Sequence, residues 1–200
     1  MKKKLLLIIM VVISMFMFTA CSSEEEKKSS NDVYSKTINV DIEIKNYGTI
    51  NLELYPLLAP ITVKNFVNLA KSGFYDGLTF HRIIDGFMIQ GGDPEGNGFG
   101  GSKNTIVGEF SANNFKNPLK HERGVISMAR GGNDYNSASS QFFIVQTTYP
   151  SLDGLYAAFG RVTSGIEIVD KICKETPVED DNGTVLKENQ PIITKIRVNE

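Results

Sequence analysis

The sequence predicts a mainly β domain that also contains two α-helices. Apolar residues alternate with polar ones over residues 38–44 and 50–54, and this period of two is typical of half-buried strands. Residues 60–73 and 165–174 carry apolar residues at helical spacing instead. With the remaining apolar runs the chain contains about eight strands, so we expect a single β-rich domain with a sizeable core.

The first two strands are predicted to form an antiparallel hairpin. Apolar side chains occupy every second position of 38–44 and of 50–54, and Asn46-Tyr47-Gly48 lies between the two runs. Such alternation on both sides of a turn indicates a hairpin with one buried face. Further strands are predicted at 80–84, 87–91, 124–128, 141–145, 158–162 and 192–197.

Two helices are predicted between these strands. Pro60 favours a helix start, because the N–H that proline lacks would have no partner in the first turn. Apolar residues between 63 and 70 then fall on one face, and Gly73 is a plausible end. Residues 165–174 predict a second, shorter helix.

The N-terminal residues predict a targeting signal. Lys2, Lys3 and Lys4 precede an apolar run that ends at Ala20, and small residues stand directly before Cys21. This order is that of a secretory signal peptide, and the cysteine resembles a bacterial lipoprotein processing site. We therefore expect residues 1–20 to be removed and Cys21 to carry a lipid.

Lipidation would place the protein on the extracytoplasmic face of the cell membrane. Two acyl chains on Cys21 would suffice for stable anchoring. The alternative is an uncleaved anchor, although the apolar run of about sixteen residues is shorter than the roughly twenty that cross a bilayer. Residues 21–37 are polar and highly charged, so we expect a flexible tether and a folded domain over 38–200.

Charge and cysteine content restrict the possible partners. The formal net charge of −2 becomes −5 without the three lysines of the signal, from 18 basic and 23 acidic residues. The chain has no basic stripe, so we expect no nucleic-acid partner. Cys173 would be the one cysteine left besides Cys21, and we expect it to be a buried small hydrophobe rather than a nucleophile.

Several local patterns suggest chemistry that their surroundings do not support. Residues 96–101 contain G-x-G-x-x-G, but no helical pattern follows, so a surface loop is favoured over a dinucleotide site. The acidic residues 179–183 lack the ligand spacing of a calcium loop and indicate a solvated turn. His81 and His121 are the two histidines of the chain. We therefore expect no metal, and no Ser/His/Asp triad can be argued from them.

Three blocks of sequence carry the strongest functional signal. They are FHRIIDGFMIQGGD at 80–93, ISMAR at 126–130 followed by SSQFFIV at 139–145, and LDGLYAAFG at 152–160. In this order they resemble the cyclophilins, the barrel-shaped peptidyl-prolyl cis/trans isomerases, over roughly residues 38–198. The resemblance implies a closed eight-stranded antiparallel β-barrel capped by two α-helices, and an activity that needs no cofactor.

The resemblance also implies roles for particular residues. Arg82 matches the catalytic arginine, and Gln90 matches the glutamine that binds the substrate backbone and orients it. An apolar pocket for the proline ring is matched by Phe87, Met88, Phe143 and Leu152. Ala129 and Arg130 match positions whose backbone lines the peptide groove. Without the resemblance, Arg82 would be interpreted as a solvated strand residue and the aromatic residues as core.

Departures from the family pattern concern the rim of this groove. Many cyclophilins have tryptophan where this chain has Ser151, and the sequence contains no tryptophan. Tyr156 stands where many have histidine, and residues 131–138 form a loop closer to the bacterial members. That tryptophan helps to bind cyclosporin, so we expect weak cyclosporin binding.

The leading hypothesis is a lipid-anchored prolyl isomerase that assists the folding of exported proteins by acting on their X–Pro bonds. A non-catalytic peptide-binding or chaperone lipoprotein could use the same groove, but Arg82, Gln90 and Phe143 favour the enzyme. A solute-binding transport lipoprotein is disfavoured, because one barrel domain offers no two-lobed cleft.

Overall fold

The computed structural model describes residues 36–199. The predicted signal peptide, Cys21 and nearly all of the predicted tether therefore lie outside the described residues. In the described part, no helix is both long and apolar enough to cross a membrane.

All eight predicted strands and both predicted helices are confirmed, with small shifts at their ends. The helices are α2 (Pro60–Lys71) and α3 (Ile166–Glu175). The strands are β1 (Ile38–Ile44), β2 (Gly48–Leu54), β3 (Thr79–Ile84), β4 (Met88–Asp93), β5 (Val125–Met128), β6 (Phe142–Val145), β7 (Ala158–Ser164) and β8 (Ile193–Asn199). Three short 3₁₀ helices cover Ser111–Asn113, Pro150–Leu152 and Lys187–Asn189.

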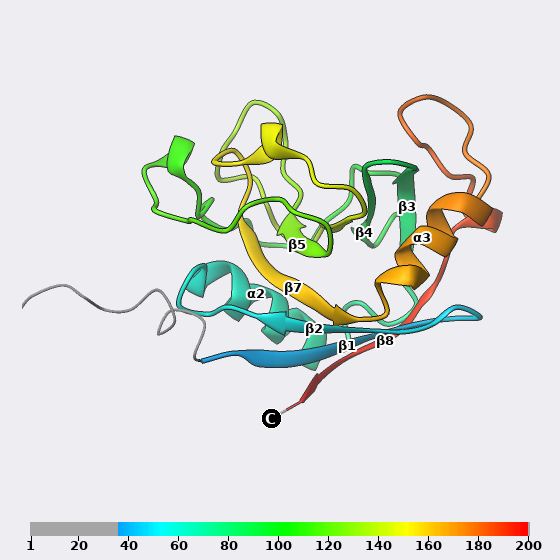
Figure 1. Ribbon diagram of the computed structural model, residues 1–200, viewed down its shortest axis with the longest axis horizontal. Helices are drawn as coiled ribbons and strands as arrows, with labels where there is room; N and C mark the ends of the chain where they lie inside the picture. The colour runs from blue at the N-terminus through cyan, green and yellow to red at the C-terminus, as the bar shows by residue number, and fades with distance from the viewer. Residues whose placement is uncertain (1–35, 200) are drawn as a thin grey trace, which may run out of the picture. The chain divides into compact units, whose positions relative to one another are not determined.

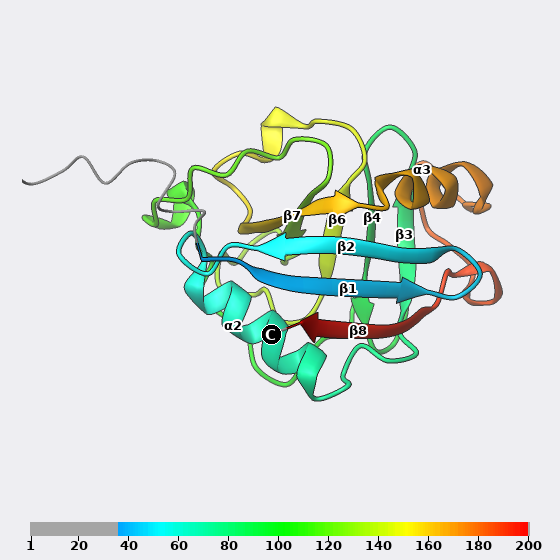
Figure 2. The same ribbon diagram turned by 60° about the horizontal axis from the view of Figure 1, so that its bottom comes forward.

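The eight strands form one antiparallel sheet in the order β3-β4-β6-β5-β7-β2-β1-β8. Strands β1, β2 and β8 run across the direction of β3 and β4, so the sheet curls strongly over its own core (Figure 1 and Figure 2). Helices α2 and α3 lie toward opposite ends of the curled sheet (Figure 2).

The expected closure of the barrel is wrong, because β3 and β8 remain the two ends of the sheet. Their ends are joined at an isolated bridge between Thr79 and Ile192, beside which Ile193 N donates to Leu78 O at 2.8 Å and Phe80 N donates to Pro191 O at 2.9 Å. Farther along, β8 diverges to pair with β1, and residues 183–185 take the outer edge of β3 instead. The curled sheet is therefore open, with its β3 edge covered by a loop.

Two apolar clusters cover the two faces of the central strands. The inner cluster is the main core, in which the Phe66 ring makes tilted or edge-to-face contacts with the rings of Tyr75, Phe142 and Phe159. The outer cluster is smaller and comprises Tyr55, Leu58, Met88, Leu119, Val125, Phe143, Val145 and Ala158. Successive residues of β6 alternate between the two clusters, as the period of a strand requires.

Candidate active site

Three of the predicted site residues, Arg82, Gln90 and Phe143, lie with Ser127 in one row across four neighbouring strands. Arg82 on β3 pairs with Gln90 on β4, Gln90 pairs with Phe143 on β6, and Phe143 pairs with Ser127 on β5. Directly paired residues of adjacent strands place their side chains on the same face of a sheet. The register therefore brings Arg82 and Phe143, 61 positions apart in the chain, to one side of the sheet.

Hydrogen bonds hold the polar part of this row in place. Arg82 Nη1 donates to Gln90 Oε1 at 3.2 Å, and Gln90 Nε2 donates to Gln141 Oε1 at 2.9 Å. Gln141 in turn donates to the backbone oxygens of Gly98 and Gly100 at 3.0 and 2.8 Å. Burial lowers the pKa of the Arg82 guanidinium, while Tyr156 and Asp180 raise it to a smaller extent. The guanidinium nevertheless remains charged at neutral pH.

A cavity of about 460 Å³ opens beside this row. All nine residues predicted for catalysis or substrate binding line it: Arg82, Phe87, Met88, Gln90, Ala129, Arg130, Phe143, Leu152 and Tyr156. The structure thus assembles in one place residues that belong to three separate sequence blocks.

Apolar side chains of the outer cluster form the floor and wall of the cavity. Met88 and Phe143 are only 1% and 5% exposed. The Phe87 ring packs on Tyr149 with 4.4 Å between centroids, and Tyr156 meets the edge of Phe143 at 5.9 Å. A compact apolar group such as a proline ring would be desolvated here, next to the charge of Arg82.

A buried polar relay supports the Phe143 ring from behind. His121 stacks on Phe143 with 6.0 Å between centroids, and its Nδ1 lies 3.1 Å from Asp153 Oδ1. Its Nε2 lies 3.0 Å from the Ser127 hydroxyl. Burial lowers the pKa of His121 against the opposing effect of Asp153, so the neutral ring donates to Asp153 and accepts from Ser127.

This relay has the residue types of a catalytic triad, which the sequence alone could not show. Ser127 is 0% exposed and His121 1%. A substrate cannot reach the hydroxyl, so the arrangement orders the site and does not supply a nucleophile. Ser127 is thus a buried strand serine whose hydroxyl holds the ring on which Phe143 stacks.

The side chain of Arg130 also has a structural role, although only its backbone was predicted to line the groove. Its guanidinium lies over the rings of Phe110, Tyr135 and Tyr156 at 5.5, 4.9 and 4.7 Å, and Nε donates to Leu155 O at 3.0 Å. Cation–π contacts of this kind are worth about 0.5–1 kcal/mol each at exposed sites. Arg130 therefore ties the 131–138 loop to the wall that carries Tyr156.

Two loops that were set aside as unrelated to function also line the cavity. Residues 96–99 and Asn182, Thr184 and Val185 belong to its wall. The glycine-rich loop is a tight surface loop as predicted, with the backbone N–H groups of Glu95, Asn97 and Gly98 donating to Asp93. No sequence pattern connected either loop to Arg82, because their positions depend on the packing of the β3 edge.

Other local predictions can be compared with the described residues. Residues 179–183 form a turn, as predicted, in which Gly183 N donates to Asp180 O at 2.9 Å. Cys173 is buried, and burial raises the pKa of its thiol to about 12, which confirms a small hydrophobe rather than a nucleophile. No cluster of three or more His, Cys, Asp or Glu side chains suited to a metal occurs within residues 36–199.

The curled antiparallel sheet thus carries a guanidinium beside a cavity with an apolar floor. Residues 39–198 match the profile of the family described as cyclophilin type peptidyl-prolyl cis-trans isomerase/CLD, and the chain belongs to this family. It is therefore a cyclophilin-type peptidyl-prolyl cis-trans isomerase.

Known relatives and structures agree with this assignment. The chain is 49% identical to peptidyl-prolyl cis-trans isomerase B of Bacillus subtilis over 145 residues, which cover 72% of this chain and 92% of that protein. It is 49% identical over 129 residues to a peptidyl-prolyl cis-trans isomerase of Helicobacter pylori, covering 64% and 76%.

A solved structure of a Cryptosporidium parvum cyclophilin, obtained in the presence of the dipeptide Ala-Pro, superposes with a TM-score of 0.71 at 34% identity. The match covers 81% of this chain and 99% of that one. Proline-containing peptides are accordingly the substrate class that fits the family.

Proposed function

We propose that Arg82 is the catalytic group and that the protein acts on exported polypeptides from a lipid anchor at the membrane. The observation that supports the first part is the charged guanidinium of Arg82 at the edge of an apolar cavity whose floor is Met88 and Phe143. The second part rests on the sequence before residue 36.

The reaction requires rotation about an amide whose resonance gives a barrier of about 18–20 kcal/mol. In our proposal the cavity floor holds the proline ring while the preceding residue rotates. An N–H of Arg82 then donates to the prolyl nitrogen, whose lone pair becomes available only when the amide twists. This hydrogen bond is stronger in the transition state than in the ground state, as catalysis requires.

The remaining cavity residues would bind and orient the peptide. Gln90 is held by Gln141 and contacts Arg82, so its amide can orient the guanidinium while it binds the substrate backbone. The backbone of Ala129 and Arg130 would align the extended peptide along the groove. Phe87, Leu152 and Tyr156 would close the proline pocket at its rim.

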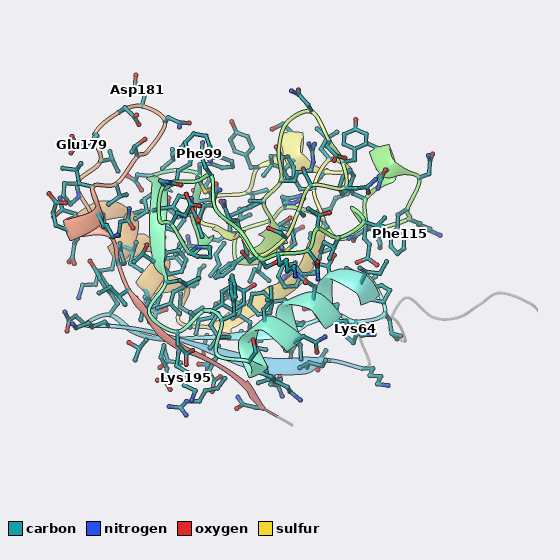
Figure 3. All side chains as sticks on the ribbon, turned by 180° about the vertical axis from the view of Figure 1, so that it is seen from behind. Lys64, Phe99, Phe115, Glu179, Asp181 and Lys195 are labelled. Atoms are coloured by element: carbon teal, nitrogen blue, oxygen red, sulfur yellow. The ribbon has the colours of Figure 1, made fainter. Side chains whose placement is uncertain are left out.

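The exchange rate of an X–Pro peptide, measured by NMR with catalytic amounts of residues 36–200, tests the role of Arg82. We expect Arg82→Ala to lower kcat/KM at least about a hundredfold, equivalent to roughly 3 kcal/mol. Lys64→Ala, an exposed change on α2, serves as the control (Figure 3). Wild-type activity in Arg82→Ala would refute the proposed role.

Membrane attachment would follow from lipidation of Cys21. The basic residues, the apolar run and the small residues before Cys21 support it, as does the polar composition of 22–36. Such a location would expose the domain to unfolded exported proteins. The sequence identifies no particular client among them.

Labelling of producing bacterial cells with a palmitate analogue, followed by fractionation, tests this part. We expect the wild-type protein in the membrane fraction with label, and Cys21→Ser without label and with its signal retained. Membrane association of Cys21→Ser together with an unlabelled wild type would instead indicate an uncleaved anchor. Wild-type protein found mainly free in the cytoplasm would contradict both forms of attachment.

A further inference from the structure

The acidic turn at 179–184 is shaped to lie close against strand β3. The Thr184 backbone N–H and hydroxyl donate to the Asp180 carboxylate at 3.0 and 2.9 Å, which closes the turn. Ile83 N donates to Gly183 O at 2.8 Å, which docks it. Gly183 has φ +81°, and a Cβ there would stand 2.2 Å from Ile83 O, so only glycine permits this approach.

This docking brings Asn182 to the guanidinium of Arg82. Arg82 Nε donates to the Asn182 backbone oxygen at 2.8 Å, and Nη2 donates to Asn182 Oδ1 at 3.2 Å. Nη1 is bound on the other side by Gln90 Oε1 at 3.2 Å. A guanidinium carries five N–H donors, so one N–H on Nη1 and one on Nη2 remain without a partner among residues 36–199.

We propose that Asn182 is a positioning residue for isomerisation, which holds Arg82 so that its two remaining N–H donors face the prolyl amide. The proposal rests on the catalytic role proposed above for Arg82. Without the Oδ1 acceptor, the guanidinium keeps its contacts with the Asn182 backbone oxygen and with Gln90, but it loses one of the three contacts that fix its orientation. A donor that must meet a twisted amide loses rate when its orientation is not fixed in advance.

The chemical nature of the acceptors on Asn182 and Gln90 supports a role in orienting Arg82. Both acceptors on Asn182 and the one on Gln90 are neutral amide oxygens, and Asp180, one of the carboxylates of the turn, accepts hydrogen bonds from Thr184. A carboxylate in the place of Asn182 would offset much of the positive charge. Neutral acceptors fix the geometry of Arg82 and leave its charge for the substrate.

The effect of Asn182 on catalysis can be measured separately from any effect on folding. Its side chain is exposed, and its φ is not among the positive values found for non-glycine residues, which occur at Asn46 and Asn114 within the described chain. Alanine can therefore adopt the same backbone conformation. Asp181 is exposed beside it, carries no role in the cavity and provides a matched control (Figure 3).

The test measures kcat and KM for a short X–Pro peptide in Asn182→Ala, Asp181→Ala, Arg82→Ala and the Asn182→Ala/Arg82→Ala double variant. Loss of one solvent-exposed hydrogen bond that orients Arg82 predicts a roughly three- to tenfold decrease of kcat in Asn182→Ala. KM and the thermal midpoint should stay close to the wild-type values. Asp181→Ala should match the wild type, and Asn182→Ala should have less than a twofold effect when Arg82 is already absent.

Three results would overturn the proposal. Wild-type kcat in Asn182→Ala would show that its amide does not orient Arg82. An effect confined to KM would make Asn182 a peptide contact instead. An equal loss with and without Arg82 would show that Asn182 acts elsewhere. The proposed function fails separately, if Arg82→Ala alone retains full activity.

Discussion

Replacing Glu109 by alanine tests how the scaffold of the site is held together. Helix α2 begins at Pro60 without a side-chain cap from its own N-terminal residues. The Glu109 carboxylate, which is 0% exposed, accepts from Ile61 N at 3.0 Å and from Thr62 N at 2.8 Å. A carboxylate 47 and 48 positions away thus satisfies the first backbone donors of the helix.

The expected cost follows from these contacts. Each hydrogen bond to a charged group contributes about 1.5–3 kcal/mol, and a carboxylate at a helix N-terminus adds up to about 2 kcal/mol in partly buried geometries. Alanine would leave the N–H groups of Ile61 and Thr62, of which the second is buried, without this acceptor. We predict that Glu109→Ala lowers the free energy of unfolding by about 3–5 kcal/mol, against a usual total of about 5–15 kcal/mol.

The same substitution should disturb the active site, because α2 supports it. Asn65 on α2 donates to Ser139 O at 2.6 Å, two positions before Gln141, which holds Gln90. Isomerase activity should therefore be lost at a lower urea concentration in Glu109→Ala than in the wild type. At low temperature without denaturant, where the folded state still predominates, activity should persist.

Urea denaturation followed by circular dichroism provides the measurement, with the transition midpoint converted through an unchanged m value. Glu109→Gln keeps an acceptor and should lose about half as much. Glu122→Ala removes an exposed ion pair with Arg161 (2.8 Å) and should cost less than about 1 kcal/mol. A loss below about 1 kcal/mol in Glu109→Ala would show that the carboxylate does not cap α2.

Three further predictions concern pH, inhibitor binding and thiol chemistry. Burial lowers the pKa of both His81 and His121, so the folded state binds fewer protons than the unfolded state. The free energy of unfolding should fall by about 1–2 kcal/mol as the pH drops from about 7.5 to about 5.5; no change in urea midpoint over this range would contradict it. Cyclosporin should bind weakly and gain roughly thirtyfold in affinity in Ser151→Trp, and calorimetric titrations that find equal tight binding would refute this. The Cys173 thiol, with its pKa raised to about 12, should react with a thiol reagent only on unfolding, and rapid labelling of the folded protein would disprove its burial.

Local patterns were sufficient to predict the eight strands and the two α-helices of the described residues, but not the three 3₁₀ helices. A period of two or of 3.6 residues is a property of a single segment, and it determines which side chains are buried without reference to other segments. The pairing of Arg82 with Gln90 is equally local, because they lie on consecutive strands of one hairpin, but their roles were predicted only from the resemblance to the cyclophilins.

The composition of the site depends on strand order, which alternation does not encode. Phe143 reaches Gln90 because β6 inserts beside β4, ahead of β5, in the sheet. His121, Ser127 and Asp153 become a relay for the same reason. A strand pattern predicts which face a residue occupies but not which strand will be its neighbour.

The edge of the sheet shows the same division between sequence and tertiary structure. Residues 179–183 were predicted correctly as a turn, since their acidic side chains and Gly183 are local signals. The contact of this turn with Arg82 and the open edge of β3 were not predictable, because they follow from the direction in which β8 leaves β3 to pair with β1. Local sequence thus determined the elements and their buried faces, while long-range backbone pairing decided which side chains surround the guanidinium.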